Sequence, residues 1–149
     1  MSDHPMPCVE PDHAELSLAE PISEHSRLCQ RLRRRYESTL AVLPDGPPVH
    51  ATMQAALSTL RAQGMTLGAG LRVVRQLVME RLVVLDCEQG AGLDVVTRAV
   101  TELAEFALDH ALADARTTLD AVYGAPMVLL PDQPPREAQL WIIGMGKLG

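Results

Sequence analysis

The residues with the clearest chemical potential are the glycines and the single lysine of the run LWIIGMGKLG, residues 140–149. Gly144, Gly146 and Gly149 follow apolar residues that are typical of a buried strand, and Lys147 lies among them. Glycines let backbone N–H groups approach a phosphate closely because they have no Cβ atom. A lysine supplies a flexible point charge for phosphate oxygens. The run therefore predicts a strand that breaks into a phosphate-binding or nucleotide-binding loop.

The same run matches the pattern G-x-G-x-x-G, which is also the fingerprint of dinucleotide-binding domains. That fingerprint requires a following helix, a second strand and an acidic residue about twenty positions further on. None of these is present within the 149 residues. On the pattern alone, a tight turn between a strand and a helix with no ligand remains open beside the nucleotide-binding interpretation.

Other residue types that could do chemistry lack the spacing for it. The carboxylates between Glu102 and Asp120 fall on more than one helix face, and no arrangement of Ser, His and Asp or of Cys and His is defensible. His110 is expected to be packed or solvated rather than a ligand. We therefore predict neither catalytic residues nor a metal site within the chain. The histidines without metal-ligand spacing are His4, His13, His25, His50 and His110.

Two groups of arginines are candidates for charge recognition. The first group, on one predicted helix, could contact an acidic partner or the acidic N-terminal segment, although a solvated helix face is favoured. The second group lies within the most apolar helix. Its members could reach an interdomain surface, although pairing with Glu80, Asp86 and Glu88 is favoured. The first group is Arg27, Arg31, Arg33, Arg34 and Arg35, and the second is Arg72, Arg75 and Arg81.

Helical periodicity and breakers predict the elements that must position these residues. Apolar residues at steps of three and four predict helices over residues 23–42, 49–63, 66–88 and about 93–122. Pro and Gly runs separate them. The expected organisation is an acidic disordered tail at 1–24, a helical region at 25–126, a linker at 127–137 and the start of a further domain at 138–149. A lone strand cannot satisfy its own hydrogen bonds, so the last segment requires a sheet from elsewhere and the sequence looks truncated.

The composition limits the classes of protein to which the chain can belong. Residues 1–24 hold six acids and no base within a chain of net charge −6, and no extended basic surface indicates a nucleic-acid partner. Cys8, Cys29 and Cys87 lack C-x-x-C spacing, which favours reduced thiols in a cytoplasm. No apolar run approaches the length of a membrane span. The expected fold is mainly α, a helical bundle followed by the first β-strand of a further, incomplete domain.

The run LWIIGMGKLG, after a long helix that ends in YGAP at residues 123–126, resembles the bacterial bifunctional glutamine synthetase adenylyltransferase/adenylyl-removing enzyme. The resemblance covers about residues 65–149. It implies that the helical bundle is followed by the first β-strand of an incomplete α+β nucleotidyltransferase domain. In that family the run continues into Ser-Asp-Ile-Asp, whose aspartates hold catalytic metal ions. The form GMGKLG close behind Met1 is similar to the N-terminal, adenylyl-removing half, so the chain is expected to be an N-terminal fragment that ends inside the first nucleotidyltransferase motif.

The resemblance implies an activity and a set of ligands. It implies a nucleotidyltransferase that removes AMP from, and in its other half adds AMP to, a tyrosine of glutamine synthetase. It also implies Mg²⁺, ATP, ADP and phosphate as ligands, and glutamine synthetase and a PII-type signalling protein as partners. Gly144, Gly146, Lys147 and Gly149 match the family's nucleotide loop. Because the metal-binding aspartates would follow the last residue, the chain alone is expected to be inactive and to bind no cofactor productively.

Two alternatives remain open at this stage. One is a helical domain fused to a truncated dinucleotide-binding oxidoreductase, which would show an acid after a second strand instead of Asp-x-Asp. The other is a helical interaction module with no active site. Because their sheet is missing, residues 138–149 are expected to be frayed or aggregation-prone, with unprotected amides.

Overall fold

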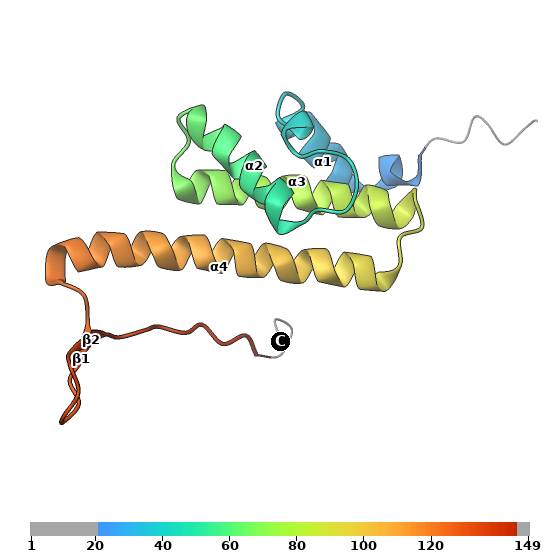
Figure 1. Ribbon diagram of the computed structural model, residues 1–149. Helices are drawn as coiled ribbons and strands as arrows, with labels where there is room; N and C mark the ends of the chain where they lie inside the picture. Colours follow the sequence, from blue (N-terminus) through green and yellow to red (C-terminus); the bar gives the residue numbers. More distant parts are fainter. Residues whose placement is uncertain (1–20, 146–149) are drawn as a thin grey trace, which may run out of the picture.

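Helices dominate the part of the chain that the structure, a computed structural model, describes, namely residues 21–145. Figure 1 shows the order of the elements along the chain. Four α-helices lie within these residues: α1 (Arg27–Tyr36), α2 (His50–Ala62), α3 (Leu67–Cys87) and α4 (Leu93–Tyr123). Two 3₁₀ turns, η2 (Ile22–His25) and η3 (Leu40–Val42), flank α1, and two short strands follow α4: β1 (Met127–Val128) and β2 (Arg136–Glu137). The prediction of a mainly helical fold is confirmed.

Three of the predicted helices have nearly the predicted bounds, and the first is divided. Residues 23–42 were expected to form one helix, whereas the structure has η2, α1 and η3 in that range. Ser26 has extended backbone angles and its side chain accepts a hydrogen bond from the backbone N–H of Cys29. This is an N-cap, and it starts a new helix rather than continuing the preceding turn. Thr66 caps α3 in the same way, through the N–H of Ala69.

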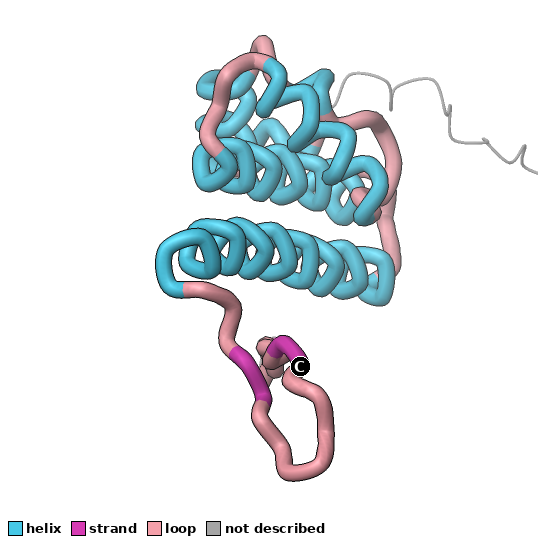
Figure 2. The backbone as a smooth tube through the Cα atoms, turned by 60° about the vertical axis from the view of Figure 1, so that its left-hand side comes forward, coloured by secondary structure: helices cyan, strands magenta, loops and turns pink. Residues whose placement is uncertain are grey.

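The helices form layers around α3. Figures 1 and 2 show α1 and α2 on one side of α3 and the long α4 on the other. The helix α3 therefore has neighbours on both sides, which explains why apolar residues occur around most of its circumference. The core lies between α2, α3 and α4 and consists of Leu43, Met53, Ala56, Leu57, Leu60, Val74, Leu77, Val78, Leu82, Leu85, Ala99, Leu103 and Phe106.

The long helix α4 is buried along its first half only. Its 31 residues span about 46 Å at 1.5 Å per residue. Ala99, Leu103 and Phe106 are buried in the core, but no side chain between residues 113 and 123 is buried. The helical register predicted to Val122 is confirmed, while the apolar residues of the second half lie exposed. No helix of the described residues is both long and apolar enough to cross a membrane.

The C-terminal strands differ from the prediction in position. Met127 pairs with Glu137 and Val128 pairs with Arg136 in an antiparallel hairpin, so both strands lie in the range expected to be a linker. Residues 138–145, where the strand was expected to begin, have no strand assignment. The physical reason is that no neighbouring strand among the described residues offers them a hydrogen-bonding edge.

Candidate functional site

Of the four predicted loop residues, only Gly144 lies within the described residues. It is exposed and follows the extended segment 138–143. Gly146, Lys147 and Gly149 lie outside the described residues. The geometry of the candidate site is therefore that of the segment leading into the loop and of the elements that hold this segment.

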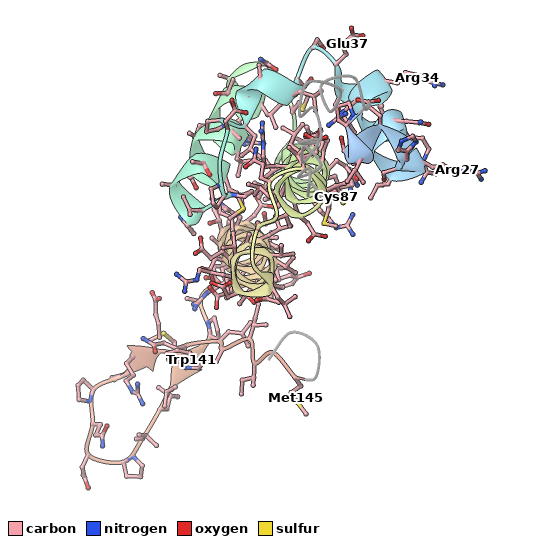
Figure 3. All side chains as sticks on the ribbon, turned by 90° about the vertical axis from the view of Figure 1, so that its right-hand side faces the viewer. Arg27, Arg34, Glu37, Cys87, Trp141 and Met145 are labelled. Atoms are coloured by element: carbon pink, nitrogen blue, oxygen red, sulfur yellow. The ribbon has the colours of Figure 1, made fainter. Side chains whose placement is uncertain are left out.

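The segment before Gly144 is apolar and exposed. Trp141 is 76% exposed and Ile143 is 80% exposed. Figure 3 shows Trp141 and Met145 lying apart from the packed helices, on the chain that follows the hairpin. Bulky apolar and β-branched residues of this kind belong in a sheet interior, where their side chains pack against neighbours. In this structure the described residues leave them in solvent.

A single arginine on α4 holds the start of this segment. The Nη1 group of Arg116 donates a hydrogen bond to the backbone oxygen of Ala138 at 3.2 Å, and Nη2 lies 3.9 Å from the carboxylate of Glu137. Its Nε lies 3.5 Å from Asp120, one turn further along α4. The Ala138 N–H donates to the Pro126 oxygen at 2.7 Å. Arg116 thus fixes the direction in which the chain leaves the hairpin.

Sequence reasoning missed Arg116. The only signal was its position: it is the one Lys or Arg between Phe106 and Tyr123, in a stretch that also carries three aspartates. A local pair with Asp120 at i, i+4 would have explained it without any longer contact. The contacts to Ala138 and Glu137, which lie some twenty residues away, are tertiary and do not follow from spacing.

A cavity of about 460 Å³ lies where α4, the hairpin and the segment meet. Its walls are mostly apolar, so it fits an apolar side chain of a packing partner better than a phosphate group. Arg116 and Asp120 are its only charged lining residues, and they pair with each other. The remaining lining residues are Leu119, Tyr123, Gly124, Pro126, Ala138, Gln139 and Leu140.

The histidine that lies on the long helix is packed, as predicted. The ring of His110 contacts Phe106 at a centroid distance of 4.5 Å, and its Nε2 lies 2.8 Å from the Oε1 atom of Gln54. His50 contacts the same phenylalanine ring at 5.2 Å, and its backbone N–H donates to Glu102 at 2.8 Å. These contacts join α2 to α4. Across residues 21–145, no group of three or more His, Cys, Asp or Glu side chains is arranged to hold a metal ion.

The predicted ion pairs of α3 have different partners in the structure. The nearly buried carboxylate of Glu80 accepts a hydrogen bond from Arg33 of α1 at 2.8 Å. Arg33 also pairs with Glu24 and lies 3.9 Å from Glu88, and the hydrogen bond that it donates to Glu80 raises the pKa of Arg33. Arg81 pairs instead with Asp45. The prediction that arginines of α3 neutralise these acids was wrong, because Glu80 lies on the face of α3 that packs against α1.

Comparison with known proteins assigns the class. The family model described as glutamate-ammonia ligase adenylyltransferase matches residues 16–149, and the chain belongs to this family of nucleotidyltransferases. The match includes the G-x-G-x-x-G run itself, so the alternative of a dinucleotide-binding oxidoreductase is not supported.

Individual relatives carry a more specific name. The chain is 45% identical over 83 residues to the bifunctional glutamine synthetase adenylyltransferase/adenylyl-removing enzyme of Chromobacterium violaceum, covering 56% of this chain and 9% of that protein. It is 34% identical over 134 residues to the protein of the same name from Ralstonia nicotianae, covering 84% of this chain and 14% of that protein. The chain thus spans about a tenth of the length of these relatives. No solved structure matches it.

Proposed function

We propose that this chain forms the helical lead-in to a nucleotidyltransferase domain that removes AMP from a tyrosine of glutamine synthetase. In this proposal residues 25–126 are the helical support, 127–137 the connection and 138–149 the start of the catalytic domain. The macromolecular substrate is glutamine synthetase, the regulator is a PII-type protein, and the reaction takes place in the cytoplasm. The full enzyme would use phosphate to release ADP in this half and ATP to attach AMP in its other half.

One observation carries the proposal: the family match extends through residue 149 and so includes the loop GMGKLG together with the helices before it. The exposed apolar residues Trp141 to Ile143 support it, because they have the composition of a sheet strand and Trp141 lies apart from the packed helices (Figure 3). Arg116 would set the position of that strand relative to α4 through the hydrogen bond to Ala138.

The proposed roles of the loop residues follow from their chemistry. Gly144, Gly146 and Gly149 would allow backbone N–H groups to approach the nucleotide or phosphate, and Lys147 would contribute a positive charge. The residues described here offer no cluster of carboxylates to a Mg²⁺ ion. The sequence 1–149 also contains no Asp-x-Asp pair. We therefore assign no metal-dependent step to these residues, and we propose that they are inactive by themselves.

A chimera tests this function. The segment of the Ralstonia nicotianae relative that matches this chain is replaced by the corresponding residues of this chain, and AMP release from adenylylated glutamine synthetase is measured in the presence of phosphate. We expect activity within about tenfold of the parent, a loss of at least about tenfold in the Lys147→Ala chimera, and no activity from residues 1–149 alone.

The matched control is Arg136→Ala, which removes an exposed basic residue from the hairpin of the same chimera. We expect this change to leave AMP release unchanged. Equal activities of the Lys147→Ala and Arg136→Ala chimeras would contradict the role of the loop. AMP release by residues 1–149 alone would contradict the proposed inactivity.

A further inference from the structure

A cationic groove of about 670 Å³ lies between α1 and the first half of α3. Its floor is apolar, and three guanidinium groups line it. No acidic side chain is among the described residues that form its walls. The apolar and neutral lining residues are Leu28, Leu32, Tyr36, Met65, Ala69, Val73 and Gln76, and the basic ones are Arg31, Arg35 and Arg72.

The three groove arginines have no acidic partner within the described part of the chain. The arginines in ion pairs within residues 21–145 are Arg33, Arg81 and Arg116. The groove residues Arg31, Arg35 and Arg72 are not among them. Arg31 and Arg35 are one turn apart on α1, a spacing at which like charges repel. Guanidinium groups stay protonated at any physiological pH. The groove therefore carries three positive charges that the described residues do not compensate.

The chain itself contains a segment with the complementary charge. Residues 1–20 carry no lysine or arginine, and apolar residues such as Val9, Leu16 and Leu18 lie among their acids. The family match starts at residue 16, so most of these acids precede the matched range. The acids are Asp3, Glu10, Asp12, Glu15 and Glu20.

We propose that the groove binds this acidic N-terminal segment of the same chain. The carboxylates of residues 10–15 would pair with Arg31, Arg35 and Arg72, and the apolar residues beside them would contact the groove floor. Residues 1–20 join η2 directly before α1, and twenty residues can extend up to about 66 Å, whereas α1 is only about 15 Å long. Because the segment is tethered, its effective concentration at the groove is in the millimolar range, roughly, which favours binding even through weak contacts.

The experiment uses the full chain with a nitroxide label on Cys8. Cys87 is exposed and is replaced by serine, and Cys29 is buried and does not take the label. We expect the label to broaden the amide resonances of residues 31–36 and 69–76, with peak intensities reduced about twofold or more at low salt. In 1 M NaCl the Debye length falls to about 3 Å, so the broadening should disappear.

Two charge-reversal pairs on the same helix make the test specific. The chain with Arg31→Glu and Arg35→Glu, called the groove variant, should lose the broadening. The matched control with Arg27→Glu and Arg34→Glu changes the charge equally but at positions that point away from the bundle, as Figure 3 shows, and it should retain the broadening. Adding Glu10→Lys, Asp12→Lys and Glu15→Lys to the groove variant should restore the broadening. Circular dichroism confirms that each variant is folded.

Three results would overturn the proposal. Broadening that survives in the groove variant would place the segment elsewhere. Equal loss in both variants would show a response to net charge alone. No broadening, together with shifts of the groove resonances on addition of inorganic phosphate, would assign the groove to a free anion instead.

Discussion

Two regions of the molecule contain similar apolar residues, which are mostly buried in one region and exposed in the other. The bundle, residues 21–112, places its Leu, Val and Met side chains mainly in a core shared by α2, α3 and the first half of α4, with α1 packed against α3. The arm, residues 113–145, contains the second half of α4, the hairpin and the segment before Gly144. Phe106 in the bundle is fully buried, whereas Tyr123, on the same helix in the arm, is 82% exposed.

The stability of the fold and the proposed chemistry therefore depend on different regions of the molecule. The helix α4 belongs to both regions, so helical periodicity alone cannot say which of its apolar residues is buried. Leu103 and Leu119 have the same side chain and the same secondary structure, yet only Leu103 has helices packed over it. The free energy of folding must come mainly from the bundle, because apolar burial is its largest favourable contribution. The arm leads into the proposed nucleotide loop and contains its first residue, Gly144.

Hydrogen exchange should show the largest contrast between the two regions. The amides of Val74 and Leu77 lie in the buried central helix and should exchange only through global unfolding, at a cost of at least about 5 kcal/mol. The amides of Trp141 and Ile142 bond to no described backbone group and should exchange at nearly the rate of an unfolded peptide. The expected ratio of protection factors is about 10³ or more. Strong protection of Trp141 would show that the arm has a partner strand.

Removing one aromatic side chain from each region sharpens the contrast. Phe106→Ala should lower the free energy of unfolding by about 3–5 kcal/mol, because the ring is fully buried between His50 and His110. Trp141→Ala should change it by less than about 0.5 kcal/mol. Urea denaturation followed by circular dichroism measures both. A large loss from Trp141→Ala would contradict the division into bundle and arm.

The ion pairs of the bundle should also contribute to its stability. Arg33→Met leaves the carboxylate of Glu80, whose side chain is 9% exposed, without its nearest cation, and should cost about 3 kcal/mol. The control Arg34→Met removes an exposed arginine from the same helix and should cost less than about 0.5 kcal/mol. The double variant Arg33→Met with Glu80→Met should recover much of the loss, since no charge is then left buried alone.

The sequence predicted the bundle well because its signals are local. The spacing of Leu71, Val74, Val78, Leu82 and Leu85 indicates a helix, and glycines mark the ends of α2 and α3. The predicted bounds of α2, α3 and α4 differ from the observed ones by one residue at most ends. Only the first helix was misjudged, because the capping role of Ser26 depends on backbone angles that no periodicity reveals.

The sequence predicted tertiary relationships less well. Arg33 and Glu80 are 47 positions apart, and their pairing depends on how α1 packs against α3. Arg116 and Ala138 meet only because the hairpin folds back toward α4. The hairpin itself was not predicted, since two residues per strand give too short a pattern to detect. The loop residues were selected from their types, their G-x-G-x-x-G spacing and the family resemblance, and three of the four lie outside the described residues.

The cysteines provide a pH-dependent measurement of the bundle. Burial raises the pKa of the Cys29 thiol above its ordinary value of 9.0, although Arg33 opposes this effect. The unfolded chain therefore ionises first as the pH rises, so the contribution to stability is present below about pH 9 and is lost above it. We expect the free energy of unfolding to fall above pH 9, and to fall less steeply in Cys29→Ala. Under native conditions Cys87, which is exposed, should react with a thiol reagent at least about tenfold faster than Cys29.

The last prediction concerns where the bundle ends within α4. Gly124 ends the helix with a φ of 79°, and its N–H donates to the Asp120 oxygen at 2.9 Å. An alanine there should cost about 1–2 kcal/mol, because side chains disfavour positive φ. If the arm opens independently of the bundle, this cost should not appear in the global free energy of unfolding, but the amides of residues 117–123 should exchange about tenfold faster.

The control for this prediction is Gly90→Ala, at a φ of 60° in the connection between α3 and α4. Its strain should appear in full in the global free energy of unfolding, because both of the helices that it joins contribute to the core. A global loss from Gly124→Ala equal to that from Gly90→Ala would mean that α4 unfolds as one cooperative unit. The second half of the helix would then be a rigid support for the proposed loop, and the boundary between bundle and arm would move from residue 112 to the end of α4.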